Sequence, residues 1–254
     1  MSKMNVFLQK KGIKILAAVI CVLLILAVAL ALLYPVLTRY IYVSKFGQEY
    51  YDHFYGLQVG DQLEFGAYEQ DRDKTNGSEP IRWQVLSVEG NKALLISSYV
   101  LDCVPYSTTE GEITWEKSHV RNWLNGTFLQ AAFTEQEKAV IPVMQSVPDR
   151  GTELGFDPGP ITYDQVSLLS YAEANRYFTS NEARQCQATG YAKMKGIWAA
   201  VEDDRCWWWL RSAGSSLSNV AYVLISGYAY SGGCKAVDDT VGVRPVIWIE
   251  IPNS

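Results

Sequence analysis

The sequence predicts an α+β protein in which one N-terminal transmembrane helix is followed by a single domain of short, mostly antiparallel strands with two or three helices. Three observations lead to this fold class: a long apolar run near the N-terminus, helix-capping signals in the middle of the chain, and β-rich runs on both sides of those signals. The segment at residues 57–254 is long enough for one well-packed core and short for two.

The apolar run extends from Ile15 to Leu37 and contains 23 residues without a charge. At a rise of about 1.5 Å per residue, a helix of this length crosses a hydrocarbon core of about 30 Å. Residues 1–14 carry four lysines, whereas only Arg39 and Lys45 follow the run closely. The positive-inside rule therefore predicts a single-pass protein of the cell membrane, with a cytoplasmic tail at residues 1–14 and an extracytoplasmic C-terminal domain.

Residues 38–56 are rich in tyrosine and phenylalanine and predict a juxtamembrane stalk, because aromatic rings favour the headgroup level of a membrane. A cleaved signal peptide is the alternative, since Ala29-Leu30-Ala31 fits the small-residue cleavage pattern, but the apolar run continues past it. Cys21 lies inside the run and fits a lipid-facing hydrophobe better than a lipoprotein site.

The charge balance bears on the class of partner. The chain has 22 basic and 27 acidic residues, which gives a formal net charge of -5. Nucleic-acid-binding domains carry an excess of basic residues where they meet the phosphates. The composition therefore predicts that nucleic acid is not a partner.

The β-rich runs "IRWQVLSV" and "KALLISSYV" flank Glu89-Gly90-Asn91, a turn-prone link that predicts a hairpin. Near the C-terminus the strand pattern returns in "CWWWLRS", "VAYVLISGYAY" and "VGVRPVIWIEI". Between these groups, Thr114 predicts the start of a helix that stops at Asn125-Gly126. Capping boxes that begin at Thr134 and Ser170 predict two more helices.

Three consecutive tryptophans lie in "RCWWWLRS", residues 205–212. Successive side chains of a strand alternate between its faces, so Trp207 and Trp209 share one face while Trp208 and Leu210 share the other. We expect this strand to be central and therefore assign Trp207 and Trp209 to the core as structural residues, with a ligand platform as the alternative.

Five motifs in order, "IRWQVL", "TWEKSHVRNWLNGTFLQAAFTEQEKAVI", "VSLLSYAEANRYF", "WWLRSAG" and "GVRPVIWI", resemble the bacterial family catalogued as domain of unknown function 6273, over nearly the whole of residues 57–251. The W-x-L-R-S strand followed by G-x-R-P is similar to the C-type-lectin-like fold of formylglycine-generating enzymes and of the variable proteins of diversity-generating retroelements. This resemblance implies that the first and last strands pair. The family has no assigned activity and supplies no catalytic residues.

Two arginines flank the final strands. We expect Arg211 and Arg244 to have structural roles, bridging carboxylates or carbonyls where those strands meet.

Residues that could carry chemistry are few. His53 and His119 are the two histidines, and neither has a second histidine nearby to build a metal or proton-relay site. The acidic stretches Glu202-Asp203-Asp204, Asp238-Asp239 and Asp71 to Gly77 lack the ligand spacing of a calcium loop and are read as solvated turns. We therefore predict no metal, no cofactor and no catalytic residue, which makes an enzyme the less favoured class.

Cys103, Cys186, Cys206 and Cys234 follow the apolar run and permit two disulfides in three connectivities. We single out Cys206 with Cys234, and free buried thiols are the alternative. Formylglycine-generating enzymes use a close pair of reactive cysteines, whereas these four are dispersed in the sequence. The resemblance therefore does not carry over the oxidase activity.

The segment Ala213 to Thr240 is dense in Ser, Gly and Tyr, the residues that dominate antibody recognition loops. In the variable proteins this region is the ligand-binding face. The candidate ligand-binding residues are Asn219, Tyr222, Ser226, Tyr228, Tyr230, Ser231 and Asp238. The alternative is that the tyrosines only cover sheet edges.

The predicted function is that of a membrane-anchored, extracytoplasmic, non-catalytic binding module for a surface or extracellular protein or glycan. The alternatives are a divergent surface-modifying enzyme related to formylglycine-generating proteins and a structural component of an envelope complex.

Overall fold

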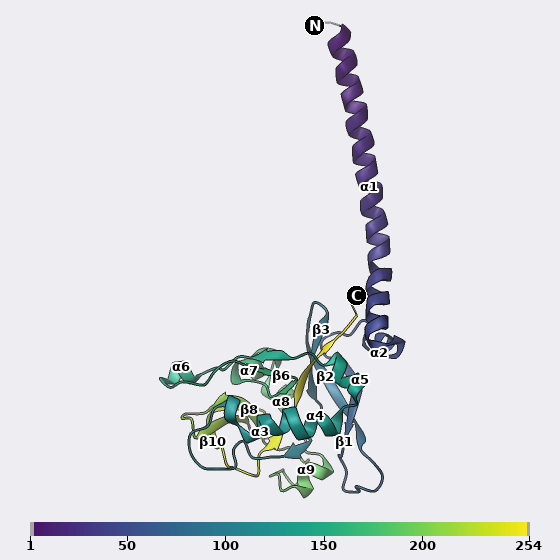
Figure 1. Cartoon of the computed structure of the whole chain (residues 1–254). Coiled ribbons are helices and arrows are strands. Elements are labelled where there is room, and N and C mark those ends of the chain that lie inside the picture. Colours follow the sequence, from purple (N-terminus) through teal and green to yellow (C-terminus); the bar gives the residue numbers. More distant parts are fainter. Residues whose placement is uncertain (1–2, 253–254) are drawn as a thin grey trace. The chain divides into compact units, whose positions relative to one another are not determined.

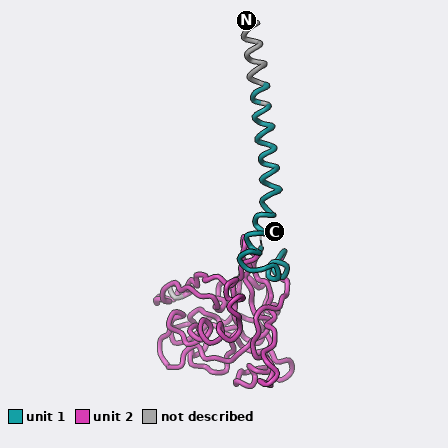
Figure 2. Tube along the Cα trace, turned by 45° about the vertical axis from the view of Figure 1, so that its right-hand side comes forward, with its two compact units in different colours: residues 1–56, 252–254 teal, residues 57–251 magenta. Residues whose placement is uncertain are grey.

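The computed structural model describes the backbone of residues 3–252 and the side chains of residues 14–16, 18–150 and 153–252. Residues 1 and 2 of the predicted tail and residues 253 and 254 of the predicted domain lie outside the described residues. The chain forms two compact units, one made of residues 1–56 and 252–254 and the other of residues 57–251 (Figure 2).

The first unit is helical. One long helix, α1 (Lys3–Phe46), is followed by the short helix α2 (Gln48–Phe54) (Figure 1). The stretch Lys14–Phe46 is long and apolar enough to span a membrane, as the prediction for residues 15–37 requires. The helix continues beyond that prediction and ends at Gly47, whose φ of 101° lies in the left-handed region that terminates helices.

One half of the second unit is a five-stranded antiparallel sheet with the order β1-β2-β3-β12-β7. Its strands are β1 (Gln62–Tyr68), β2 (Glu79–Glu89), β3 (Lys92–Ser97), β12 (Val246–Glu250) and β7 (Val166–Ser167). β2 and β3 form the predicted hairpin around Gly90, whose φ is 61°.

The expected pairing of the first and last strands is wrong, because β12 lies between β3 and β7 while β1 lies at the edge of the sheet. Burial explains the difference. All but the first residue of β3 are buried, so both of its edges need partners inside the protein. β1 instead begins with alternating exposed and buried residues, which suits an edge strand.

The other half is a second five-stranded sheet with the order β10-β9-β8-β11-β4. Its strands are β10 (Ala229–Lys235), β9 (Asn219–Val223), β8 (Trp208–Ala213), β11 (Gly242–Val243) and β4 (Asp102–Cys103). Neighbouring strands are antiparallel except for β8 and β11, which are parallel. A small additional sheet pairs β5 (Met144–Ser146) with β6 (Thr162–Asp164).

Short helices connect the two sheets, and they are more numerous than the two or three predicted. They are η1 (Trp115–Lys117), α3 (His119–Trp123), η2 (Leu124–Phe128), α4 (Leu129–Ala132), α5 (Glu135–Val140), α6 (Gly151–Leu154), α7 (Tyr171–Tyr177), α8 (Asn181–Arg184) and α9 (Gly190–Met194). Both predicted capping boxes are present, at Thr134 before α5 and at Ser170 before α7.

The helix predicted to run from Thr114 to Asn125-Gly126 differs in the structure. Thr114 makes no side-chain cap; a single 3₁₀ turn comes first, and Ser118 caps α3 by accepting from the Arg121 N–H at 3.2 Å. The chain then stays helical through Gly126, because this glycine does not adopt a positive φ.

Strand β8 carries core side chains on both faces, in the predicted alternation. Trp208 and Leu210 belong to the main core cluster, which also contains residues of β9. Trp209 lies on the opposite face, where its indole N–H donates to the Val104 carbonyl at 3.1 Å and its ring centre lies 5.9 Å from that of Tyr106. Both Trp208 and Trp209 are fully buried.

Two buried arginines make the contacts expected of structural residues. Arg211 donates to both carboxylate oxygens of Glu173 and to the Leu168 carbonyl, the latter at 2.7 Å. Arg244 donates through Nε to the Ser97 carbonyl at 2.9 Å. Each guanidinium therefore links segments that are distant in the sequence.

Glu173 is both the capping-box residue of α7 and the partner of Arg211. Glu173→Gln keeps a carbonyl oxygen for the cap but leaves the buried Arg211 charge without its carboxylate. We expect the free energy of unfolding to fall by about 2–4 kcal/mol, somewhat below the cost of breaking a fully buried pair because the Glu173 side chain is 33% exposed. Urea unfolding measures this loss.

The matched control is Glu137→Gln, at the same position of the other capping box and without an arginine partner among the described contacts. We expect it to change stability by less than about 1 kcal/mol. Equal losses for the two variants would assign the effect to the cap and not to the ion pair.

The same pair makes stability depend on pH. Burial raises the pKa of Glu173, but the hydrogen bonds and positive charge of Arg211 outweigh burial and hold the pKa below its ordinary value. This carboxylate therefore stabilises the fold above its unfolded pKa of about 4.3, and that contribution is lost as the pH falls through the lower, folded value. The stability difference between wild type and Glu173→Gln should shrink below about pH 4, as followed by urea unfolding. A difference that stays constant down to about pH 3 would contradict this.

Candidate functional site

Four aromatic side chains lie side by side in a continuous row along one face of the second sheet. We define the aromatic row as Trp198, Trp207, Tyr222 and Tyr230. Neighbouring ring centres are 4.8, 5.7 and 5.8 Å apart along the row, and the first two rings are stacked with an interplanar angle of 22°. The two end residues, Trp198 and Tyr230, are each 42% exposed. The row is therefore open to a ligand at both ends.

Strand pairing builds most of the row. Tyr222 on β9 lies opposite Trp209 on β8 and opposite Tyr230 on β10. Directly opposite residues project to the same face of a sheet, and Trp207 shares that face because it lies two residues before Trp209. The same face of the sheet therefore buries Trp209 and carries the aromatic row where fewer side chains cover it.

Trp198 comes from outside the segment predicted to bind. An antiparallel bridge between Ala199 and Cys206 puts Trp198 opposite Trp207. The Trp198 N–H also donates to the Thr240 carbonyl at 2.9 Å, which ties it to the loop before β11. Sequence reasoning missed Trp198 because these contacts join segments that carry no shared motif.

Trp207 differs from its predicted core role. It is partly exposed, whereas its neighbours Trp208 and Trp209 are fully buried. The physical reason is what covers each ring: Tyr106 packs against Trp209, but the ring stacked on Trp207 is the exposed Trp198. Trp207 therefore belongs to the aromatic row.

Polar groups lie beside the middle of the row. Burial raises the pKa of the Tyr222 hydroxyl, and repulsion from Cys234, Tyr230 and Asp238 adds to the rise. The hydroxyl therefore stays protonated at neutral pH and keeps its proton to donate. The Asp238 carboxylate accepts from the N–H and the hydroxyl of Thr240 at 2.9 and 2.6 Å, which fixes its orientation.

The turn between β9 and β10 extends this face. Tyr228 lies two residues before Tyr230, just ahead of β10, and is 49% exposed. The Ser226 hydroxyl accepts from the Tyr228 N–H at 3.4 Å and stays within the turn. Gly227 has a φ of 80°, and a Cβ there would meet the Asn181 carbonyl oxygen at 1.7 Å. Only glycine lets the turn approach α8 so closely.

Two predicted ligand residues lie apart from the row. Asn219 pairs with Lys235 at the other end of the hairpin and lines a separate shallow cavity of about 190 Å³. Ser231 follows Tyr230, and its carbonyl accepts from Arg150 at 2.7 Å. The structure therefore gathers Tyr222, Tyr230 and Asp238 but not these two.

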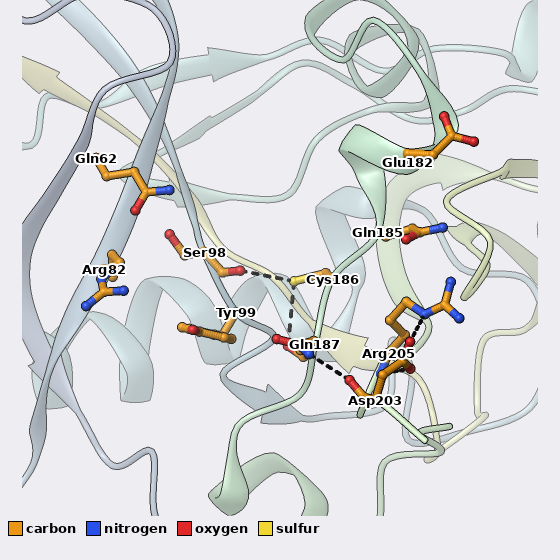
Figure 3. A pocket seen from close by; sticks show the side chains of 10 residues that line it. All are labelled: Gln62, Arg82, Ser98, Tyr99, Glu182, Gln185, Cys186, Gln187, Asp203 and Arg205. Atoms are coloured by element: carbon orange, nitrogen blue, oxygen red, sulfur yellow. Dashed lines mark hydrogen bonds and ion pairs between the residues drawn. The ribbon is translucent and has the colours of Figure 1, made fainter. Parts of the chain in front are cut away.

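A polar pocket of about 500 Å³ lies elsewhere on the second unit (Figure 3). We call it the polar pocket; it is lined by Gln62, Arg82, Ser98, Tyr99, Glu182, Gln185, Cys186, Gln187, Asp203 and Arg205. Figure 3 shows Gln62 and Arg82 on one side of the pocket and Gln185 and Arg205 on the other. Sequence reasoning missed this pocket because its residues come from separate segments that form no motif.

The chemistry of the polar pocket is that of hydrogen bonding. Arg205 donates through Nε to Asp203 at 2.5 Å, and the Gln187 amide donates to the Asp203 carbonyl at 2.7 Å. The thiol of Cys186, a buried residue, lies 3.4 Å from the Ser98 carbonyl. Acidic, basic and amide groups all line the cavity, which suits a small polar ligand.

The acidic stretches are held by the chain's own groups. Asp204 pairs with Lys193 at 2.7 Å, and Asp203 pairs with Arg205. Among the described residues, Glu69, Asp71 and Glu79 are the one group whose carboxylates approach closely enough for a metal. Backbone N–H groups already occupy two of them: Glu79 accepts from Gln70 at 2.6 Å and Asp71 from Asp73 at 2.5 Å.

The suggested disulfide between Cys206 and Cys234 is wrong for this fold. Cys234 on β10 lies opposite Val220 on β9, and Val220 lies opposite Ala213 on β8. Cys206 precedes β8 at its other end and is separated from β10 by an intervening strand. Neighbouring strands are about 4.8 Å apart, so the distance across the intervening strand, which is two such spacings, already exceeds the Cα distance of about 7 Å that a disulfide tolerates. In the structure no disulfide links Cys206 to Cys234.

The comparisons with known proteins concern the family of the second unit. The family model described as Domain of unknown function (DUF6273) matches residues 90–251, which is more than half of the chain. The match begins at the turn after β2, so β1 and β2 lie outside it, although the motif resemblance began at residue 57. None of the curated proteins or solved structures matches the chain. The chain therefore belongs to the DUF6273 family.

Proposed function

We propose that this chain is a membrane-anchored binding module that holds its C-terminal domain outside the cell membrane and captures a surface protein or glycan, without chemistry of its own. The observation that carries the proposal is the aromatic row. The C-type-lectin-like relationship implied by the sequence resemblance belongs to this proposal, and its support is the W-x-L-R-S strand β8 beside the G-x-R-P segment that begins in β11.

The aromatic row has the features of a recognition surface. Tyr and Trp side chains bury a large contact area with few rotatable bonds, and they dominate the hot spots of protein interfaces. Exposed aromatic faces also stack against the C–H faces of sugar rings. The strand pairing of β9 with β8 and β10 fixes two of the four rings, Tyr222 and Tyr230, which limits the entropy lost when a ligand binds.

The orientation follows from charge. The four lysines before the apolar stretch favour a cytoplasmic N-terminus, because positive residues are retained on that side. The domain would then face the exterior, where a capture module meets its ligand. A divergent surface-modifying enzyme is the second candidate, and the polar pocket with its Asp203–Arg205 pair is the feature that favours it.

The orientation is tested by protease protection. A protease added to intact cells that express the full chain with an N-terminal epitope tag should digest the C-terminal domain and leave the tag protected, because the membrane shields only the cytoplasmic side. Antibodies against the tag and the domain report the fragments. A domain that is digested only after the cells are permeabilised would reverse the orientation, and a domain released into the medium would favour signal cleavage.

Binding is tested on the ends of the aromatic row. Trp198→Ala and Tyr230→Ala should each weaken capture about 30-fold or more, as expected for hot spots worth about 2 kcal/mol. Their free energies of unfolding should change by less than about 1 kcal/mol, because each residue is 42% exposed and lies outside the core cluster. The assay measures binding of the detergent-solubilised chain to surface polysaccharide and surface protein fractions of the source cells, which separates the two ligand classes.

Two variants serve as controls. Trp208→Ala lies one position from the row but in the core, and should cost about 3–5 kcal/mol of stability. Tyr163→Ala removes another exposed tyrosine, on β6, and should leave capture unchanged. Undiminished capture by the Trp198 and Tyr230 variants would remove the row from the function. If only polar-pocket variants such as Arg205→Ala lost activity, the enzyme candidate would take its place.

A further inference from the structure

Cys186 and Cys206 lie directly opposite one another on two antiparallel segments. Gln187 forms an antiparallel bridge with Arg205, and the Cys206 N–H donates to the Cys186 carbonyl at 3.0 Å. The next hydrogen bond, from Ala188 to Asp204, continues the ladder at 2.9 Å. Residues opposed in this way have Cα atoms about 5.5 Å apart, inside the range of about 4.4–6.8 Å found for disulfides.

The two side chains also share one face. Both cysteines are buried in the same core cluster, together with Trp208. The Cys206 Sγ lies 3.6 Å from the Cys186 carbonyl, and the Cys186 Sγ lies 3.4 Å from the Ser98 carbonyl. The Cys206 sulfur thus lies against the backbone of Cys186.

The other described cysteines outside the apolar helix are placed less well for this pairing. The Cys103 Sγ is directed to the Asp239 carbonyl, 2.9 Å away. Cys234 lies on β10, which β9 separates from β8. The fold therefore selects one pair, and it is not the pair suggested by the sequence.

We propose that Cys186 and Cys206 form a disulfide that closes the loop carrying α9 and Trp198. The oxidant is a disulfide of the thiol-exchange class, such as oxidised glutathione or an oxidoreductase. One thiolate attacks it to give a mixed disulfide and release one thiol, and the second cysteine then displaces the other thiol. The S–S bond forms as two protons and two electrons pass to the exchanging disulfide.

The bond forms during folding and not afterwards. Burial raises the pKa of both thiols in the folded domain, which keeps them protonated and slows exchange. Once formed, the bond holds the base of residues 187–205, the loop that supplies the exposed end of the aromatic row. It thereby limits the motion of Trp198, whatever ligand the row captures.

Peptide mapping tests the pairing directly, because each cysteine falls in its own tryptic peptide. The full chain is unfolded in detergent, refolded in a glutathione redox buffer, blocked with N-ethylmaleimide and digested. We expect "QCQATGYAK", which contains Cys186, to be linked to "CWWWLR", which contains Cys206, while Cys103 and Cys234 carry the maleimide. Reductant should lower the melting temperature of this chain by about 6–12 °C, as expected for a loop of this size.

Variants make the outcome decisive. The Cys103→Ser/Cys234→Ser double variant should keep the linked peptides and the reductant-sensitive melt, whereas Cys186→Ser should lose both. If refolding fails, the same peptide mapping is done on the chain after it is extracted from membranes directly into N-ethylmaleimide. Any other dominant pairing, or maleimide on both Cys186 and Cys206 in the cooperatively folded chain, would overturn the proposal. Neither result would bear on ligand capture by the row.

Discussion

The buried guanidinium of Arg244 links the two large sheets and holds them in a fixed relative position. Arg244 lies between β11 of the second sheet and β12 of the first, and it donates to the Ser97 carbonyl at the end of β3. Its guanidinium carbon lies 5.1 Å from the ring centre of Trp208 on β8. Hydrogen bonds to carbonyl oxygens and an aromatic face offset part of the cost of removing this charge from water. The chain crosses between the sheets at this residue, so β8 is fixed relative to β3 and the outer face of β8 is fixed with it.

The candidate sites depend on that strand. Trp208 anchors the inner face of the second sheet in the core, and Trp209 fills the outer face beneath Tyr106. Cover on the outer face ends at Trp207, where the side chain is free to meet Trp198. The aromatic row therefore lies at the edge of a core that is packed on both faces of β8, where the backbone is held by the core and the side chains are partly exposed.

Short sequence patterns correctly predicted the elements that depend on residues close together in the sequence. The hairpin at Gly90 and the capping boxes at Thr134 and Ser170 depend on residues within a few positions of one another, and the alternation of Trp207 to Leu210 depends only on the period of a strand. The helix start at Thr114 differed because Ser118, a few residues later, offered a better cap.

Features set by long-range pairing could not be predicted in this way. β12 lies beside β3 because buried β3 needs a second partner, which no motif in either strand encodes. Three adjacent tryptophans have the same intrinsic preference for burial, and only the folded domain decides which ring is covered, with Tyr106 packed on Trp209 and the exposed Trp198 stacked on Trp207. The polar pocket likewise joins residues from Gln62 to Arg205 that meet only in the folded domain.

Alternation also explains how one short stretch serves several parts of the domain. Between Arg205 and Trp208 the side chains turn outward and inward in succession: Arg205 lines the polar pocket, Cys206 enters the core, Trp207 joins the aromatic row, and Trp208 returns to the core. Because the period of a strand is two, a shift of one residue would bury Arg205 and Trp207 and expose Cys206 and Trp208. Burying a charged arginine and exposing a tryptophan both cost free energy, so the register of this stretch is strongly specified. The constraint that keeps Trp208 in the core is therefore the same one that leaves Trp207 partly exposed.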